Sequence, residues 1–127
     1  MAKILTVDDS SITRKFVKVT LQQEGHSVHT AENGLEALEM LLRDPHDMVV
    51  ADINMPKMDG FELVVALRKD EVYKNIPIIL LSSMYGADDI KKGIRLGANI
   101  YLTKPTDPEK LLYCVRTLLE QKKAEIT

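Results

Sequence analysis

The chain has 127 residues, the usual length of one domain, and a formal charge of -2 from 17 basic and 19 acidic residues. Such a charge gives no electrostatic footprint for DNA, RNA or anionic lipid, so direct nucleic-acid binding is not expected. The longest apolar stretches are about five residues, far below the ~20 that span a bilayer, and the start does not resemble a signal peptide. We therefore expect one cytoplasmic domain over residues 1–127 without membrane insertion, with 120–127 as a polar C-terminal tail.

Short apolar runs alternate with segments of helical periodicity along the whole chain. Strands are expected at 4–7, 27–31, 48–51, 77–81 and 100–102, and helices at 10–25, 34–44, 61–70, 87–96 and 108–119. This alternation is typical of a parallel sheet with right-handed crossover helices. The predicted fold is a three-layer α/β/α, doubly wound (βα)5 domain whose five-stranded parallel sheet has the flavodoxin-like strand order 2-1-3-4-5.

Each expected helix has an apolar face that should pack against the sheet. The inward residues are expected to be Ile12, Phe16 and Val19, then Leu35, Leu38 and Leu41, then Phe61, Val64 and Val65, then Ile90 and Ile94, and finally Leu111, Leu112, Val115, Leu118 and Leu119. The fourth helix has the thinnest apolar face and should be the most mobile. Cys114 and the three histidines, His26, His29 and His46, lack metal-ligand spacing, so ordinary structural roles are expected for them.

Polar side chains follow four of the five expected strands at their carboxyl ends. Asp8 and Asp9 follow the first strand, Asp52 the third, Ser82 ends the fourth, and Lys104 comes after the fifth. Carboxylates that share a crevice raise one another's pKa unless a hard cation lies between them. A hydroxyl and an ammonium beside them can hold a phosphoryl group. The sequence therefore predicts an all-oxygen site for Mg²⁺, or Mn²⁺, rather than for zinc.

Taken together, these residues resemble the receiver domain of two-component response regulators, the CheY-like family, over essentially the whole chain. The motifs that carry the resemblance are Val7-Asp8-Asp9-Ser10, Asp52-Ile53-Asn54-Met55-Pro56 with Met58-Asp59-Gly60, Ser82, and Tyr101-Leu102-Thr103-Lys104-Pro105. The chain has Thr106 where many family members carry a large apolar residue. It has Asn99-Ile100 where the receivers of many winged-helix transcription factors carry acidic residues used in a dimer interface.

The resemblance implies a role for each acidic residue. Asp52 is expected to be the phosphoacceptor. Asp9, Asp52 and the backbone carbonyl of Asn54 are the expected ligands of Mg²⁺, with Asp8 acting directly or through water. The chain would then be a phosphoacceptor signalling domain rather than an enzyme, capable at most of phosphorylating itself from small donors and of autodephosphorylation.

The resemblance also implies how the phosphoryl group is sensed. Ser82 is expected to be the switch hydroxyl, Lys104 the lysine that contacts the phosphoryl group, and Tyr101 an aromatic side chain that changes rotamer. A cis peptide bond is expected between Lys104 and Pro105, since X-Pro bonds adopt cis at the lowest cost.

The implied partners are a histidine kinase or phosphotransfer protein and a downstream protein target. The target is expected on the face made by the fourth helix, fifth strand and fifth helix, next to Tyr101. This face carries a basic patch, which we call the basic patch below, of Lys91, Lys92, Arg95 and Lys110. The chain is expected to be a monomer or a weak dimer.

Two alternatives stay open from the sequence. The chain could be the receiver segment of a longer regulator with an attached output domain. An aspartyl-phosphate hydrolase of the haloacid dehalogenase type also uses a strand-end aspartate and Mg²⁺, but it needs an Asp-x-Asp pair after its first strand. Val7-Asp8-Asp9-Ser10 does not have that spacing.

Overall fold

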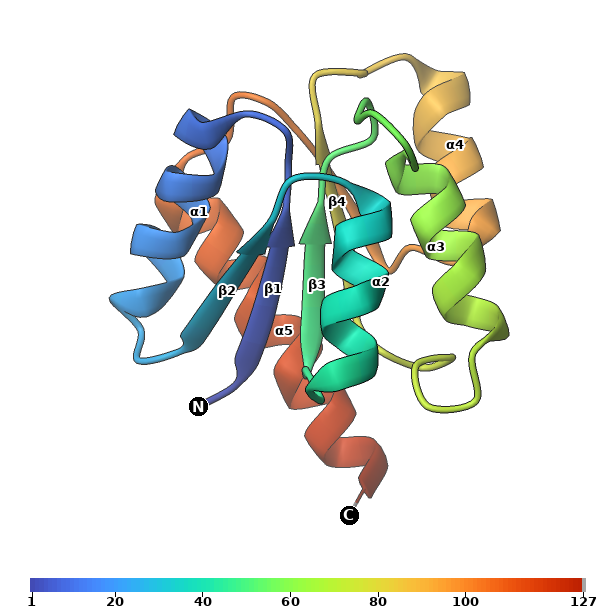
Figure 1. Ribbon diagram of the computed structural model, residues 1–127. Helices are drawn as coiled ribbons and strands as arrows, with labels where there is room; N and C mark the ends of the chain where they lie inside the picture. Colours follow the sequence, from blue (N-terminus) through green and yellow to red (C-terminus); the bar gives the residue numbers. More distant parts are fainter. Residues whose placement is uncertain (127) are drawn as a thin grey trace.

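A computed structural model describes the backbone of residues 1–126 and the side chains of residues 1–124. The strands are β1 (Lys3–Val7), β2 (Ser27–Ala31), β3 (Met48–Ala51), β4 (Ile78–Ser82) and β5 (Ile100–Thr103); the helices are α1 (Ser11–Gln22), α2 (Gly34–Arg43), α3 (Gly60–Lys69), α4 (Ala87–Leu96) and α5 (Pro108–Ile126). The strands form one parallel sheet in the order β2-β1-β3-β4-β5, which confirms the predicted topology (Figure 1).

Two apolar cores lie on opposite faces of the sheet, because successive side chains of a strand point to opposite sides. Leu5 and Val49 belong to the core under α2, α3 and α4, whereas Ile4 and Val50 belong to the core under α1 and α5. All four residues of β3 are buried. A strand covered on both faces is apolar throughout, so its first polar residue marks the end of the sheet.

The strand register brings these polar ends to the same level. Val7 pairs with Ala31 on β2 and with Ala51 on β3, and the Asp52 amide donates to the Val7 carbonyl at 2.8 Å. At the β4–β5 pair of the same sheet, the Lys104 amide donates to the Ser82 carbonyl at 2.8 Å. The residues that follow β1, β3, β4 and β5 therefore meet along one edge.

The expected inward faces of α1 and α2 are partly wrong. Ile12 is 82% exposed and Val19 is 44% exposed; the buried residues of α1 are Val17, Thr20 and Leu21. In α2, Leu41 is buried as expected, but Leu35 is 44% exposed. The periodicity gave the helices correctly, while the phase of the buried face was wrong because a small polar residue, Thr20, occupies a core position.

Helix α4 approaches the sheet through a glycine rather than through its isoleucines. Of its residues, all of which the structure describes, only Gly93 is buried, and Ile94 is 46% exposed, contrary to the sequence-based expectation. A Cβ atom at Gly93 would lie 2.9 Å from Leu80 Cδ1 and 3.1 Å from Tyr101 Cδ2. The helix can lie this close to β4 and β5 because position 93 has no side chain.

Helix α5 begins as predicted and continues further. The Asp107 carboxylate accepts a hydrogen bond from the Lys110 amide at 2.8 Å, which is the expected N-cap. The helix extends to Ile126, so residues 120–126 are helical where a polar tail was predicted, and residue 127 lies outside the described residues. Within residues 1–126, no helix is both long enough and apolar enough to cross a membrane.

Two histidines predicted to have ordinary roles form a pair at the opposite end of the sheet. His29 Nδ1 and His46 Nε2 lie 3.1 Å apart, and His46 Nδ1 lies 2.9 Å from the Asp44 carbonyl. Burial lowers the pKa of His46, and the nearby charge of Lys3 lowers it further. These surroundings therefore favour the neutral form of the His46 side chain.

We expect the stability of the protein to fall as the pH drops through the lowered folded-state pKa of His46. Above the ordinary pKa of 6.5, both states are neutral; below it, the unfolded chain binds the proton first and is favoured. His46→Gln should flatten the dependence of the free energy of unfolding on pH below the ordinary pKa of 6.5. Urea unfolding at several pH values measures this, and equal slopes for both proteins would contradict it.

Candidate functional site

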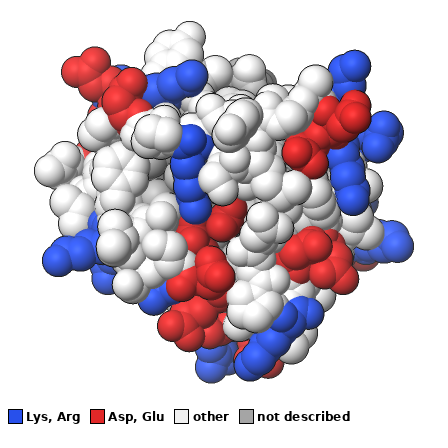
Figure 2. Space-filling view, turned by 90° about the horizontal axis from the view of Figure 1, so that it is seen from above, with Lys and Arg blue, Asp and Glu red and all other residues white. Residues whose placement is uncertain are grey.

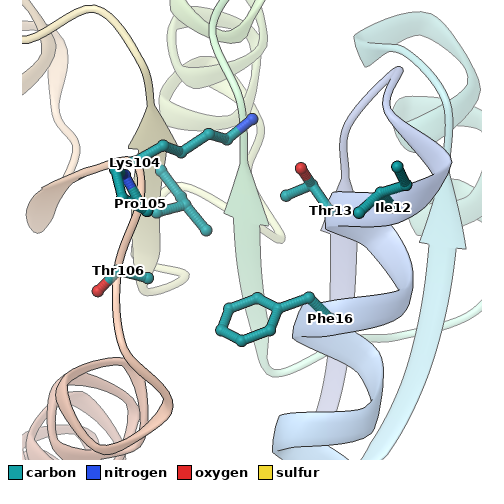
Figure 3. A pocket seen from close by; sticks show the side chains of 7 residues that line it. Ile12, Thr13, Phe16, Lys104, Pro105 and Thr106 are labelled. Carbon is teal, nitrogen blue, oxygen red and sulfur yellow. The ribbon is translucent and has the colours of Figure 1, made fainter.

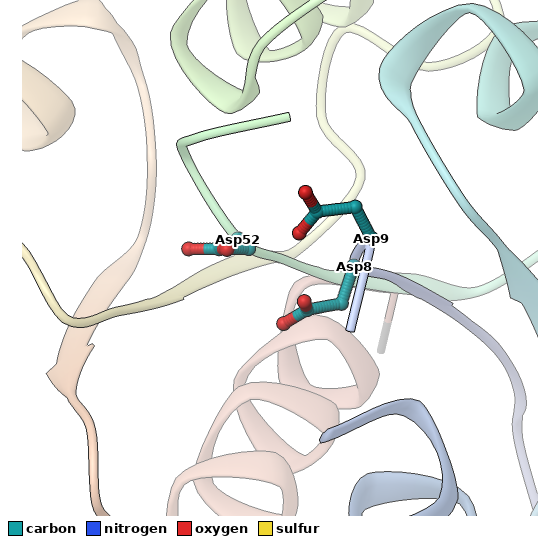
Figure 4. Close-up of side chains that lie close together, drawn as sticks. All are labelled: Asp8, Asp9 and Asp52. Atoms are coloured by element: carbon teal, nitrogen blue, oxygen red, sulfur yellow. The ribbon is translucent and has the colours of Figure 1, made fainter. Parts of the chain in front are cut away.

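Three carboxylates converge at the carboxyl edge of the sheet. Asp8 and Asp9 follow β1, Asp52 follows β3, and one oxygen from each lies within 4.8 Å of the others (Figure 4). Asp8 and Asp52 are buried and Asp9 is exposed. Oxygen ligands of this kind suit a hard divalent cation such as Mg²⁺. The structure thus brings together the acidic residues that the sequence singled out.

Lys104 is the counter-charge of this cluster. Its Nζ lies 2.8 Å from Asp8 Oδ2 and 3.4 Å from Asp52 Oδ2, so it bridges the two buried carboxylates. The Lys104-Pro105 peptide bond is cis, as expected. Seen from above this edge of the sheet, acidic side chains gather near the middle of the face with basic side-chain atoms beside them (Figure 2).

The two aspartates after β1 have different surroundings. Asp8 Oδ1 accepts the Ser10 amide at 2.9 Å, Asp8 Oδ2 binds Lys104, and the Asp8 carbonyl accepts from Arg14 Nη1 at 2.7 Å. Within residues 1–124, the Asp9 carboxylate has no hydrogen bond or ion pair to the protein. Asp8 is therefore held in place by the fold, whereas the oxygens of Asp9 are available to a ligand.

Burial raises the pKa of Asp52, and the charge of Asp8 raises it further. The Ile53 amide, which donates to Asp52 Oδ1 at 2.7 Å, opposes this effect together with Lys104 and Ser82. The charged form of the Asp52 carboxylate is therefore destabilised on balance, although Ile53, Lys104 and Ser82 each stabilise it. A cation or a covalent modification at this position would relieve the imbalance.

The backbone of Met84 connects the serine and the tyrosine that were predicted to form the switch. Ser82 is fully buried, and its Oγ accepts the Met84 amide at 3.2 Å. The Tyr101 hydroxyl donates to the Met84 carbonyl. The turn between β4 and α4 is therefore bonded to both side chains. Sequence reasoning missed Met84 because a backbone group has no sequence signature.

Helix α3 is packed directly against the backbone of Asp52. A Cβ at Gly60 would lie 2.2 Å from the Asp52 carbonyl oxygen and 2.8 Å from Ile53 Cα, so only glycine fits there. Asp59 caps the helix, with its carboxylate accepting the Glu62 amide at 2.8 Å and Glu62 accepting the Asp59 amide at 3.0 Å. This reciprocal cap fixes the end of the loop that begins at Asp52.

One member of the basic patch points elsewhere. Lys92 Nζ lies 4.5 Å from the centroid of the Phe61 ring, a cation–π contact between α4 and α3. Lys92 thus lines the groove between α3 and α4, which also includes Val65 and Leu96. The sequence grouped Lys92 with Tyr101, whereas the structure shows the Lys92 ammonium in contact with α3 through Phe61.

An apolar cavity of about 330 Å³ lies beside Lys104, between α1 and the segment that follows β5. It is lined by Ile12, Thr13, Phe16, Leu81, Lys104, Pro105 and Thr106 (Figure 3). Ile12, wrongly expected to face the core, is at its rim. Within the described residues, the buried Thr106 hydroxyl has no hydrogen-bond partner. The small threonine leaves room that a large apolar side chain would fill.

The chain is similar in sequence and in fold to known proteins. The response regulator receiver domain model matches residues 4–116. The chain is 41% identical to the chemotaxis protein CheY4 of Vibrio cholerae, with a TM-score of 0.88 and coverage of 93% of this chain and 98% of that one. It is 38% identical over 111 residues to a chemotaxis protein CheY homolog of Campylobacter jejuni, covering 86% of this chain and 85% of the homolog.

Longer proteins match as well. The chain is 38% identical over 117 residues to the response regulator PleD of Caulobacter vibrioides, a match that covers 92% of this chain but 26% of PleD. The similar structures agree with the fold and its strand order. The chain therefore belongs to the response regulator receiver domain family, the CheY-like receivers of two-component signalling.

Proposed function

We propose that Asp52 accepts a phosphoryl group from a phosphohistidine on a histidine kinase or phosphotransfer protein. An Asp52 oxygen attacks the phosphorus, the bond from phosphorus to the imidazole nitrogen breaks, and its electron pair stays on the imidazole. An aspartyl phosphate forms on Asp52. The observation that carries this proposal is the convergence of Asp52 with two further carboxylates and Lys104 at one edge of the sheet.

The donor set fits Mg²⁺, with Mn²⁺ as a substitute. Asp9, Asp52 and the Asn54 carbonyl would hold the ion, with Asp8 acting directly or through water. When bound, Mg²⁺ neutralises charge on the carboxylates and on the phosphoryl oxygens. Lys104, which now neutralises Asp8 and Asp52, is within reach of a phosphoryl oxygen on Asp52 and would transfer its contact to it.

Phosphorylation would then act on the turn between β4 and α4. The Ser82 Oγ accepts the Met84 amide, and a phosphoryl oxygen on Asp52 would accept the Ser82 hydroxyl hydrogen and draw Oγ toward itself. The Met84 carbonyl, which accepts from Tyr101, belongs to the same turn. We therefore place the downstream target on the face of α4, β5 and α5, with the exposed Lys91, Arg95 and Lys110 in its neighbourhood.

The phosphodonor has a suitable docking surface on the other side of the site. The apolar cavity beside Lys104 and the exposed Ile12 of α1 lie next to the acidic cluster. A helix that carries the phosphohistidine could bury apolar side chains there while its imidazole faces Asp52.

A receiver segment of a longer regulator is the second candidate, because the match to PleD covers 26% of that protein. In either case residues 1–127 would act as one receiver unit and not as an enzyme. A cytoplasmic location stays a prediction of the sequence.

The assignment of the metal ligands predicts unequal effects of two neighbouring aspartates. Asp9→Ala should weaken Mg²⁺ binding at least ~10-fold, and more than Asp8→Ala, because Asp9 has no protein partner while Asp8 is bonded to Lys104 and Ser10. Isothermal titration of the metal-free variants measures this. Asp88→Ala, which removes an exposed carboxylate on α4, is the control. Equal losses for Asp8 and Asp9 would show that the roles are shared or reversed.

A further inference from the structure

We propose that Gly34, at the start of α2, is a positioning residue for the phosphorylation site. Its contact with Met58 fixes the loop of residues 54–59 that follows Asp52, and thereby sets the affinity of the acidic cluster for Mg²⁺. This inference rests on the proposed function, because that function makes the loop a source of a metal ligand, the Asn54 carbonyl.

The contact between α2 and the loop is too close for any side chain at position 34. The Gly34 amide donates to the Met58 carbonyl at 3.0 Å. A Cβ at Gly34 would lie 2.8 Å from that carbonyl oxygen and 2.8 Å from Met58 Cγ. The φ angle of Gly34 lies outside the left-handed region, so an alanine could adopt its backbone conformation. The glycine is needed for the close approach alone.

The support on the α2 side is rigid. Asn33 is buried, and its side chain caps the helix by accepting the Glu36 amide at 2.9 Å. This cap fixes the first turn of α2. A Cβ at Gly34 would therefore displace the loop rather than the helix.

The loop on the other side has a conformation that needs external support. The Met58 amide donates to the Pro56 carbonyl at 2.7 Å, and this tight turn places Lys57 at a φ of 67°. A non-glycine residue in this region costs about 1–3 kcal/mol and persists only where its surroundings hold it. The hydrogen bond from Gly34 supports this turn at Met58. Two residues later, the Gly60 amide donates to the Ile53 carbonyl at 2.8 Å and ties the end of the loop to its start.

Small movements of this loop matter because Mg²⁺ demands nearly ideal octahedral ligand positions. Groups that orient a ligand without touching the metal commonly contribute 10–100-fold to affinity, as a rough guide. Gly34 is such a group by this argument. Its contact lies at the opposite end of the loop from Asp52 and Asn54, so no direct effect on the carboxylates is involved.

The first experiment is Mg²⁺ titration of the folded Gly34→Ala variant by calorimetry, with circular dichroism and metal-free thermal unfolding as checks of the fold. We expect affinity to fall about tenfold or more, while phosphorylation by a small phosphoramidate donor recovers at saturating Mg²⁺. Glu39→Ala, on the exposed face of the same helix, is the matched control and should bind as the wild type does. Metal-free unfolding that matches the wild type would show that the lower affinity is not a loss of the fold.

Adding Met58→Ala to Gly34→Ala separates the side-chain contact from the backbone contact. It removes the Cγ contact and leaves the carbonyl contact, so most of the loss should persist. Full recovery of affinity in the double variant would overturn the role of the loop backbone.

A measurement on the unmodified protein keeps the proposal testable even if Gly34→Ala does not fold. If the hydrogen bond between the Gly34 amide and the Met58 carbonyl raises the affinity for Mg²⁺, then bound Mg²⁺ must stabilise that hydrogen bond by the same factor. Hydrogen exchange of the Gly34 amide should therefore slow on adding Mg²⁺. Unchanged exchange with Mg²⁺ bound, or equal Mg²⁺ affinity of Gly34→Ala and wild type, would overturn this inference alone. Failure of the wild type to bind Mg²⁺ through Asp9 would instead overturn the proposed function.

Discussion

Asp52→Asn is expected to abolish phosphorylation by a small phosphoramidate donor in the presence of Mg²⁺. An amide oxygen is a poor nucleophile and a weaker metal ligand than a carboxylate. The other two carboxylates of the cluster should not replace Asp52, because Asp8 is bonded to Ser10 and Lys104 and Asp9 is exposed. Intact-mass spectrometry should show an adduct of one phosphoryl group on the wild type and none on the variant. Asp88→Asn, on the exposed surface of α4, is the control and should be modified normally.

The same substitution should make the metal-free protein more stable at neutral pH. Burial raises the folded-state pKa of Asp52 above its ordinary value of 3.8, so the unfolded chain loses this proton at a lower pH than the folded one. The stability that the proton contributes is complete below 3.8 and is lost as the pH rises through the folded pKa. Asparagine carries no charge to bury.

We therefore expect Asp52→Asn to raise the Tm by several degrees at neutral pH and by little near pH 3.8 or below. Differential scanning calorimetry without Mg²⁺ measures both. A lower Tm at neutral pH would mean that the Ile53 and Lys104 contacts outweigh burial. An undiminished phosphoryl adduct on the variant would disprove Asp52 as the phosphoacceptor.

Lys104→Ala is expected to destabilise the metal-free protein strongly and to uncouple phosphorylation from the switch. Removing the lysine leaves Asp8, which is buried, without its counter-charge and brings it into conflict with Asp52. Losing one partner of a buried ion pair costs roughly 3 kcal/mol. Mg²⁺ should restore most of the loss, because a cation then replaces the ammonium. Urea unfolding with and without Mg²⁺ tests this.

Phosphorylation itself should persist in Lys104→Ala, since the nucleophile and the metal ligands remain. The amide chemical shifts of Met84 and Tyr101 should no longer change on phosphorylation, as the contact that orients the phosphoryl group is gone. Lys110→Ala is the matched control, because within residues 1–124 Lys110 forms no ion pair. Normal shift changes in Lys104→Ala would restrict the lysine to a structural role.

The acidic cluster could be predicted from the sequence because one physical rule is enough to place its residues. Parallel strands end at one edge of the sheet, so the polar residues after the apolar runs had to meet. Asp8, Asp9, Asp52 and Lys104 all follow this rule. The cis bond before Pro105 came from the family resemblance.

Other features depend on packing that the pattern of apolar residues does not encode. Thr20 and Gly93 occupy buried positions that a search for large apolar side chains passes over, so the faces of α1 and α4 were misplaced. Lys92 counts as a surface charge until the Phe61 ring beneath it is known. The bonds of Met84 and the contact of Gly34 with Met58 involve backbone atoms, which every residue type has.

Gly93, through which α4 contacts the sheet, also makes the free energy needed to move that helix small. Burial stabilises roughly in proportion to apolar area, at about 25 cal/mol per Å². In α4 only Gly93 is fully buried, and Ile90 and Leu96 are half-buried, so the helix contributes little such area. A second placement of α4 on the sheet would then cost little free energy of burial. A partner or a phosphoryl group that prefers one placement by only ~1–3 kcal/mol therefore changes the ratio of the two populations 5- to 150-fold.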